Sequence, residues 1–310
     1  MSHKTCELRV GMSGWTYPPW RGEFYPKGIS QKRELEYASR RLNSIEINGS
    51  FYSLQRPASY QAWYDQTPDD FVFAMKGGGF ITHIRRLRDV KTPLANFFAS
   101  GVLNLKGKLG PILWQFPENF HIDLKRFEEF FELLPRDTKQ ASKLARGHGK
   151  LKFRASTTTD QNREVRYAVE VRHSSYLDRA FFKLLRKHNI AIVIADAAGK
   201  WPSIEDITAD FLYLRLHGDK ELYVSGYTDD AIQRWADRIN KWRTRSMPSD
   251  ARLTFPDLSK RPPRCRAIFV YFDTDVKVRS PLNAVELSRR LGLRPPEDAM
   301  LASRDRIHRG

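Results

Sequence analysis

The sequence is poor in cysteine. It has two among 310 residues, Cys6 and Cys265, and neither lies in a CxxC pair. Two cysteines are too few for a disulfide framework, and a metal site built on paired cysteines is excluded as well. Both precede strand-like segments, so we expect them at the end of the fold that lies away from any active site.

Long hydrophobic runs and several familiar catalytic motifs are also missing. No stretch of 18 or more apolar residues occurs, so no segment is expected to span a membrane. The first ten residues, MSHKTCELRV, contain no apolar signal-peptide region, and we therefore expect a cytoplasmic protein. A P-loop, a GxSxG elbow and an HExxH motif are absent, so nothing points to the reactions that those motifs support.

Acidic residues are scarce relative to basic ones. Lys and Arg number 53 against 36 Asp and Glu, which gives a formal net charge of +17. Residues 136–166 (nine basic, three acidic) and 241–266 (eight basic, two acidic) contribute +6 each. Both are rich in polar residues and lack apolar periodicity, so we predict solvated basic loop insertions at about 136–166 and 243–266. An arm that binds nucleic acid is the alternative.

The sequence does contain a repeated alternation of strand-like and helix-like segments. Eight short runs rich in β-branched and aromatic residues have the length of strands: 7–14, 44–52, 71–77, 111–117, 166–173, 190–198, 211–218 and 267–275. Helical periodicity is found at 29–43, 123–135, 175–189, 228–242 and 281–293. Thr228 is the expected N-cap of the fourth helix, and Pro93 is expected to break the helix that follows the third strand.

This alternation indicates an α/β fold, the (β/α)8 TIM barrel, because eight strand–helix units fit within one chain of this length. A doubly wound open sheet is the alternative, but it ordinarily carries a GxGxxG turn after its first strand. The sequence there is GMSGWTYPPW instead. We predict one domain over 1–310, with a barrel core over about 7–293 and a C-terminal tail over 294–310.

Polar residues gather at the C-terminal ends of the predicted strands. Side chains alternate between the two faces of a strand, and outward positions of a barrel pack on helices, so these polar groups are expected to point into the barrel mouth. The expected site residues are Glu46, Asn48, Lys76, Gln115, Glu170, Arg172, Asp196, Arg215, His217 and Asp273. His173 is expected to contribute from the rim. His83 is equally well explained as a capping or surface histidine.

Charge pairing limits what this ring of side chains can bind. Lys76, Arg172 and Arg215 are interleaved with the carboxylates and already neutralise them, which suits an anionic group such as phosphate, sulfate or carboxylate. A metal needs three or four Asp, Glu or His ligands without competing cations, so we predict neither a metal nor another cofactor. For any single pair of these oppositely charged residues, the alternative to a role in binding is an ion pair that only fills the upper layer of the barrel.

The loop GMSGWTYPPWRGEFYP, which follows the first predicted strand, is unusually aromatic. Its glycines and prolines suggest a fixed path, and its place after a strand puts it at the barrel mouth. Trp20, Phe24 and Tyr25 are expected to cover the helices or the barrel rim. Trp15 and Tyr17 lie nearest the strand end and are expected to face a ligand.

Eight local motifs follow one another along the chain. They are GMSGWTYPPWRGEFYP, IEINGSFY, TPDDFVFAMK, ITHIRRL, GPILWQFPENF, VEVRHSSY, ADFLYLRLHG and YFDTD followed by NAVEL. In this order they resemble the YecE-like family, a domain of unknown function, from about residue 8 to 292. The resemblance implies a TIM barrel that is distantly related to sugar isomerases and similar in fold to the endonuclease IV barrels. It implies no established reaction.

The preferred function is an enzyme of isomerase or lyase type that acts by acid–base chemistry on a small sugar or phosphorylated substrate. Glu46 or Glu170 is the expected general base, assisted by Lys76. His217 is the expected proton partner. Arg172 and Arg215 are expected to hold an anionic group.

Two other functions remain open. One is a nucleic-acid-binding protein or an endonuclease IV-like, metal-dependent phosphodiesterase, whose basic loops contact phosphates and whose aromatic residues stack on a base. The other is a non-catalytic barrel that binds a ligand or a protein partner. The sequence does not indicate an oligomeric state.

Overall fold

The computed structural model describes residues 6–220, 222, 226–258, 267–273 and 278–293. Predictions that concern Cys265 and the tail 294–310 lie outside the described residues. Within them, no helix is both long and apolar enough to cross a membrane.

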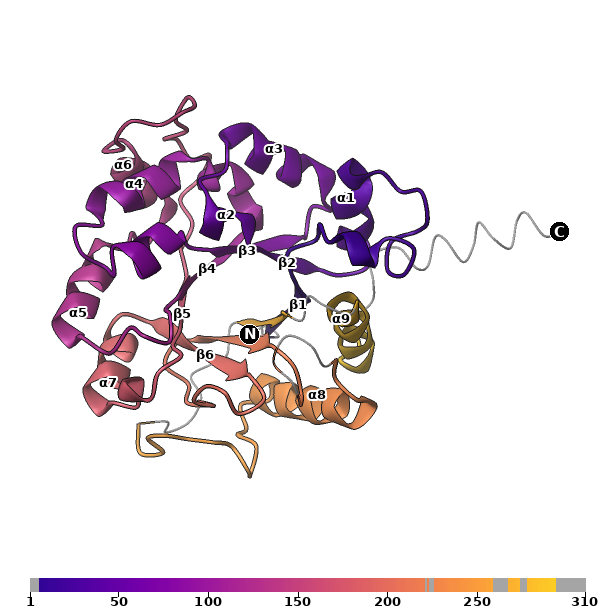
Figure 1. The fold of residues 1–310 in the computed structure, drawn as a ribbon. Helices are drawn as coiled ribbons and strands as arrows, with labels where there is room; N and C mark the ends of the chain where they lie inside the picture. The colour runs from indigo at the N-terminus through magenta and orange to yellow at the C-terminus, as the bar shows by residue number, and fades with distance from the viewer. Residues whose placement is uncertain (1–5, 221, 223–225, 259–266, 274–277, 294–310) are drawn as a thin grey trace, which may run out of the picture.

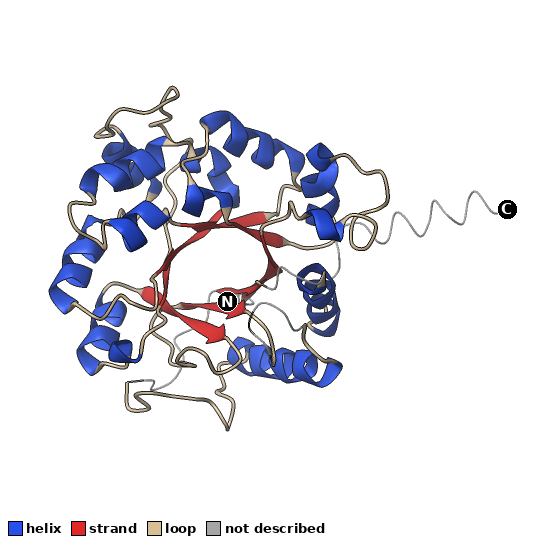
Figure 2. Cartoon of the chain, viewed as in Figure 1, coloured by secondary structure: helices blue, strands red, loops and turns tan. Residues whose placement is uncertain are grey.

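Eight parallel strands close into a barrel in chain order, and the helices surround it (Figures 1 and 2). The strands are β1 (Glu7–Ser13), β2 (Ser44–Ile47), β3 (Val72–Lys76), β4 (Leu109–Gln115), β5 (Tyr167–Glu170), β6 (Ile190–Asp196), β7 (Phe211–Leu216) and β8 (Ala267–Phe272). The last strand pairs with the first, from Glu7 opposite Ala267 to Met12 opposite Phe272. This closure confirms the predicted (β/α)8 barrel.

Small and aromatic side chains fill the barrel interior. One buried cluster takes alternate residues of six strands: Val72, Ala74, Leu113, Ala168, Ala191, Val193, Ala195, Phe211, Tyr213, Ala267, Phe269 and Tyr271. The intervening residues pack outward with the helices in a second, larger cluster. Because strand side chains have a period of two, Arg215 follows Tyr213 and Glu170 follows Ala168 on the interior face. The interior of the barrel is therefore apolar along most of the strands and polar at their C-terminal ends.

Nine helices occur among the described residues. They are α1 (Glu34–Ser39), α2 (Gly49–Tyr52), α3 (Pro57–Gln66), α4 (Lys91–Ala99), α5 (Leu124–Leu133), α6 (Thr138–Ala145), α7 (Arg179–Lys187), α8 (Asp229–Arg243) and α9 (Arg279–Arg290). Short 3-10 or π segments are η1 (Pro18–Trp20), η2 (Gln31–Arg33), η3 (Phe80–Ile84), η4 (Val102–Lys108) and η5 (Ser174–Tyr176). The side chain of Thr228 accepts a hydrogen bond from Ala231 N, which confirms the predicted N-cap of α8.

Two expectations about helices were wrong. Pro93 does not break a helix, because it is the third residue of α4, where its missing N–H would have no partner within the helix. The segment 136–166 is not all loop, because it contains α6, whose Ala141 and Ala145 are buried. Asp137 caps this helix by accepting a hydrogen bond from Gln140 N at 2.8 Å.

Candidate functional site

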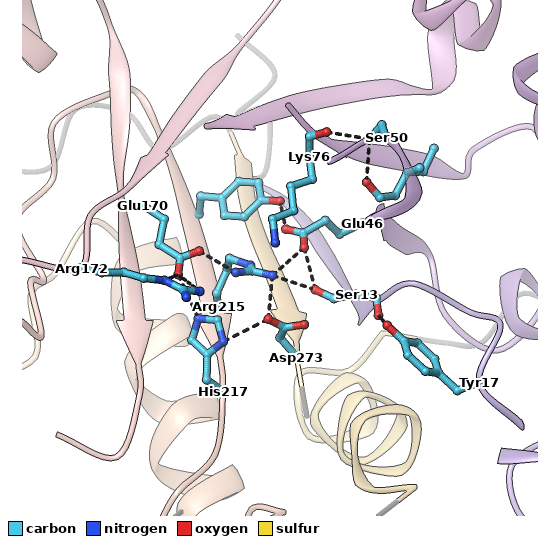
Figure 3. A network of polar contacts seen from close by, with 12 residues as sticks. Ser13, Tyr17, Glu46, Ser50, Lys76, Glu170, Arg172, Arg215, His217 and Asp273 are labelled. Atoms are coloured by element: carbon cyan, nitrogen blue, oxygen red, sulfur yellow. Dashed lines mark hydrogen bonds and ion pairs between the residues drawn. The ribbon is translucent and has the colours of Figure 1, made fainter. Parts of the chain in front are cut away.

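Arg215 lies at the centre of a buried polar cluster at the C-terminal end of the barrel (Figure 3). Its Nη1 donates to Glu170 Oε2 at 2.5 Å. Its Nη2 donates to Glu46 Oε1 at 2.9 Å and to Asp273 Oδ2 at 2.8 Å. One guanidinium thus joins carboxylates from β2, from β5 and from the end of β8. This arrangement confirms the interior orientation predicted for all four side chains.

Glu46 is held by two further donors. Ser13 Oγ donates to its Oε1 at 2.7 Å, and the Tyr213 hydroxyl donates to its Oε2 at 2.5 Å. Burial, followed by the nearby Glu46 charge, raises the pKa of Tyr213 well above its usual value, so the phenol keeps its proton as a donor. Both oxygens of Glu46 are therefore already engaged.

Glu170 has a second cationic partner and a histidine beside it. Arg172 donates to Glu170 Oε1 through Nε at 3.0 Å and Nη2 at 2.9 Å. His217 Nε2 lies 3.4 Å from the same oxygen, and its Nδ1 lies 3.1 Å from Asp273 Oδ2. His217 therefore lies between the carboxylates of Glu170 and Asp273.

The paired carboxylates are weak bases. Burial by itself would raise the pKa of Glu170, but the charges of Arg215 and Arg172 overcome this effect and hold the pKa well below its usual value. The pKa of Asp273 is likewise lowered, because Arg215 and His217 outweigh its burial. The general-base role expected for Glu170 therefore fits the geometry poorly, and so does anion binding by the enclosed Arg215.

Lys76 differs from the other charged residues of the site. It ends β3 on the interior face, its side chain runs toward Glu46 and Arg215 (Figure 3), and 8% of the residue is exposed. Its Nζ lies 4.5 Å from the centre of the Phe51 ring. Among the described residues, Lys76 forms no ion pair and its Nζ has no hydrogen-bond partner. Burial and then the Arg215 charge lower its pKa.

Two amides extend the polar surface of the site. Asn48 lies two residues beyond Glu46, and its buried Oδ1 has no hydrogen-bond partner among the described residues. Gln115 ends β4 and is nearly buried. It lies two residues after Leu113, which belongs to the interior cluster. Both amides lie at or just beyond the C-terminal end of their strands.

Asp196 and His173 do not join the cluster. Asp196 follows the interior residue Ala195 and therefore points outward, where its Oδ2 accepts hydrogen bonds from Tyr227 and from Trp235 of α8, both at 3.1 Å. His173 Nδ1 accepts from Ser175 N at 3.0 Å and so caps η5, and its ring stacks on His121 at 4.0 Å. The place expected for Asp196 in the barrel mouth was therefore wrong, whereas the contribution from the rim expected of His173 stays a prediction.

The aromatic loop after β1 has a covering part and a part near the site. Trp20 and Tyr25 are fully buried and Phe24 nearly so, which confirms their predicted role as cover. The Trp15 ring packs edge-on against Trp63 of α3 at 5.2 Å between centroids. The Tyr17 hydroxyl donates to the carbonyl of Ser13 at 3.2 Å, next to Glu46 (Figure 3). Of the two rings expected to face a ligand, Tyr17 is the one beside the cluster.

Trp201 is a site residue that the sequence did not reveal. The Arg172 guanidinium lies 3.7 Å from the centre of its ring, and the same ring meets His217 edge-on at 5.1 Å. Its Nε1 donates to Glu118 at 2.8 Å. A signal existed in the long connection between β6 and β7, which contains a tryptophan but no helical periodicity.

His83 also lies closer to the site than the sequence indicated. It is part of η3, a single π-helical turn of a kind that often occurs at functional sites. Its ring meets Phe51 edge-on at 5.0 Å, and Phe51 also contacts Lys76. Burial, followed by the charges of Lys76 and Arg172, lowers the pKa of His83 to about 4. The imidazole is therefore neutral at neutral pH.

Comparisons with known proteins agree with this fold. The family model described as "Protein of unknown function DUF72" matches residues 9–305. The UPF0759 protein YecE of Escherichia coli strain K12 is 25% identical over 259 residues, which cover 82% of this chain and 89% of that protein. A crystal structure of a DUF72 family protein from Thermotoga maritima has a TM-score of 0.66 at 22% identity, covering 92% of this chain and 99% of the other. One from Enterococcus faecalis has a TM-score of 0.65 at 15% identity, covering 93% and 96%.

Proposed function

We propose a function for this chain as a member of the DUF72 family, to which it belongs because that family's model matches residues 9–305. The function is an enzyme that acts by acid–base chemistry on a small sugar or sugar phosphate at the C-terminal mouth of the barrel. The observation that carries the proposal is Lys76, a nearly buried amine without an ion pair among the described residues, beside carboxylates that are paired with other cations.

In this proposal Lys76 replaces Glu46 and Glu170 as the proton-transfer group. A general base works best when its pKa lies near the working pH, and burial together with Arg215 lowers the pKa of Lys76 toward that range. The carboxylates and Arg215 form a fixed electrostatic frame around it. His217, between Glu170 and Asp273, is the candidate proton donor.

The substrate class follows from the groups around Lys76. Asn48 and Gln115 offer amide donors and acceptors to hydroxyl groups. Arg172 keeps 13% of its side chain exposed and is therefore better placed than the enclosed Arg215 to meet a phosphate. The Tyr17 ring, beside Ser13, suits the apolar face of a sugar. Together these groups favour a polyhydroxylated, anionic ligand.

Ligand titration followed by a turnover assay tests the proposal. Calorimetry with a panel of sugars, sugar phosphates and inorganic phosphate is expected to find binding, and NMR of the bound compounds is expected to find conversion. Lys76→Met should reduce turnover by about 10²–10⁴-fold, the usual contribution of acid–base catalysis. Lys143→Met, a change at an exposed position of α6, is the matched control. Indifference to every compound, or full activity of Lys76→Met, would refute the proposal.

Nucleic-acid binding is the second candidate, and a basic groove favours it. A groove of about 390 Å³ lies beside the loops that follow β3 and β4, and its lining includes Arg86, Arg88, His121 and Arg126. Single-stranded DNA, titrated at low and at moderate salt, is therefore included in the panel. Affinity for DNA that falls steeply with salt, without binding of any sugar phosphate, would favour this candidate instead.

A further inference from the structure

We propose that Lys76 is a nucleophile that forms an imine with an aldehyde or ketone group of the substrate. This inference rests on the proposed function and specifies it, because it restricts the substrates to carbonyl compounds such as open-chain sugar phosphates. The proposal is carried by the position of the amine, by its lack of an ion pair among the described residues and by the guanidinium partners that the neighbouring carboxylates already have.

The backbone at Lys76 is held by hydrogen bonds on both sides of its peptide unit, which fixes the base of the side chain. Ser50 Oγ donates to the Lys76 carbonyl at 2.6 Å, and the next residue, Gly77, donates from its N–H to Leu113 O at 2.8 Å. The residue keeps 8% of its surface exposed, and its Nζ lies over the Phe51 ring. An amine fixed at its base can be presented to the carbonyl carbon of a bound ligand in one orientation.

The neighbouring carboxylates already have cationic partners other than the lysine. Glu46 and Asp273 each contact the Arg215 guanidinium, and Glu170 contacts both Arg215 and Arg172. A charged Lys76 would therefore lie in a nearly dry site without an ion pair among the described residues, which is unfavourable.

The environment of Lys76 lowers its pKa and so shifts the amine toward its neutral form. Burial acts first and the positive charge of Arg215 second, and both lower the pKa of Lys76. The charges of Asp273 after β8, Glu46 of β2 and Glu170 of β5 act in the opposite direction but do not cancel the lowering. Lys76 in turn lowers the pKa of His83 in η3. Desolvation and a neighbouring cation are the two means by which proteins make a lysine nucleophilic.

The chemical step is balanced without an oxidant or a reductant. The lone pair of the neutral Nζ attacks the carbonyl carbon, and the electrons of the C=O double bond move to oxygen, which takes up a proton that the nitrogen releases. The hydroxyl group of the resulting carbinolamine takes up a proton from solvent and leaves as water, and the nitrogen keeps its remaining proton. A C=N bond replaces the C=O bond, and the protonated imine can then accept electrons from an adjacent C–H or C–C bond.

Reductive trapping on the unmodified protein tests this proposal. The full chain is incubated separately with glyceraldehyde 3-phosphate, dihydroxyacetone phosphate and pyruvate, each with sodium cyanoborohydride, and the adducts are located by peptide mass spectrometry. For at least one probe we expect the adduct on Lys76 to form at least ~10-fold faster than on the exposed Lys143, as a depressed amine pKa implies. Adducts no faster on Lys76 than on Lys143 for all three probes would overturn the proposal.

Two variants separate this inference from the proposed function. Lys76→Arg keeps a cation but cannot form an imine, and Lys143→Arg is its control; circular dichroism and melting temperature verify folding. Loss of turnover in Lys76→Arg together with a Lys76 adduct in the wild-type protein supports the imine. Turnover of a sugar phosphate with no Lys76 adduct overturns the imine and leaves the acid–base function standing. If the variants do not fold, the wild-type adduct map decides by itself.

Discussion

Arg215 is the residue on which the polar end of the barrel depends. It is fully enclosed and binds three carboxylates that are themselves buried. A buried ion pair adds little over an apolar substitute, but removal of one partner leaves uncompensated charges in a dry site. Removal of the Arg215 guanidinium would leave Glu46 and Asp273 without a guanidinium partner, and Glu170 with Arg172 alone.

We expect Arg215→Met to lower the free energy of unfolding by about 3–5 kcal/mol, because it leaves buried carboxylates unpaired. Urea denaturation followed by circular dichroism measures the effect. Arg289→Met, which removes an exposed pair with Glu286 on α9, should change stability by no measurable amount. Equal stability of the wild-type and Arg215→Met proteins would show that the network does not hold the barrel end.

At the scale of elements, the turn after β3 sets the position of Lys76. Gly77 follows the lysine directly, and a Cβ atom built on it would lie 2.2 Å from the Trp114 ring of β4. No side chain fits there without displacement of a ring that is itself fully buried. The close passage of β3 along Trp114 therefore requires glycine at this position.

Gly77→Ala is expected to destabilise the protein by about 1–3 kcal/mol, the usual cost of overpacking a core. It should also weaken ligand binding, because the backbone shift moves Lys76. Gly49→Ala is the control, since its nearest neighbour, Gln55 Nε2, would lie 3.4 Å away. Melting temperatures and the ligand titrations measure both effects. A Gly77→Ala protein that melts with the wild type would contradict the packing argument.

At the scale of the whole molecule, the buried carboxylates connect stability to pH. The folded-state pKa values of Glu170 and Asp273 are lowered, so the unfolded chain binds more protons than the folded protein in acid. Their contribution to the free energy of unfolding is present above the pKa values that these groups have in the unfolded chain, which are about 4. It is lost as the pH falls through their lower pKa values in the folded protein. The dependence of stability on these two groups is therefore confined to acidic pH.

We expect the free energy of unfolding to fall as pH is lowered from about 5 toward 2, and to fall less steeply in Asp273→Asn, which lacks one of the titrating groups. Urea denaturation at a series of pH values gives both slopes. Glu286 of α9, whose pKa is lowered to about 2 by Arg289 and Arg290, contributes equally to both proteins and cancels in the difference. Identical slopes would show that Asp273 does not titrate as described.

Local pattern was enough to predict the barrel and most of its polar mouth. The eight strand-length runs and the intervening helices define the fold, and the period of two places Glu46, Glu170 and Arg215 on the interior face. The expectation for Asp196 was wrong because it relied on the position of the residue at the end of the strand. The period of two places Ala195 on the interior face and Asp196 on the outer face. The Thr228 cap was predictable because capping depends on residues three positions apart.

The pairing of charged side chains within the barrel mouth could not be predicted, because it depends on distances between residues that are far apart in the sequence. Glu46 and Arg215 are 169 positions apart, and their contact is set by the tilt and register of strands around the closed barrel. Closure also brings Trp201 over Arg172 and leaves Lys76 beside a cluster whose carboxylates already have cations. The alternation of side chains along each strand determines which polar residues face inward, and the sequence contains it. Only the geometry of the closed barrel determines which cation neutralises each carboxylate and which amine is left to react.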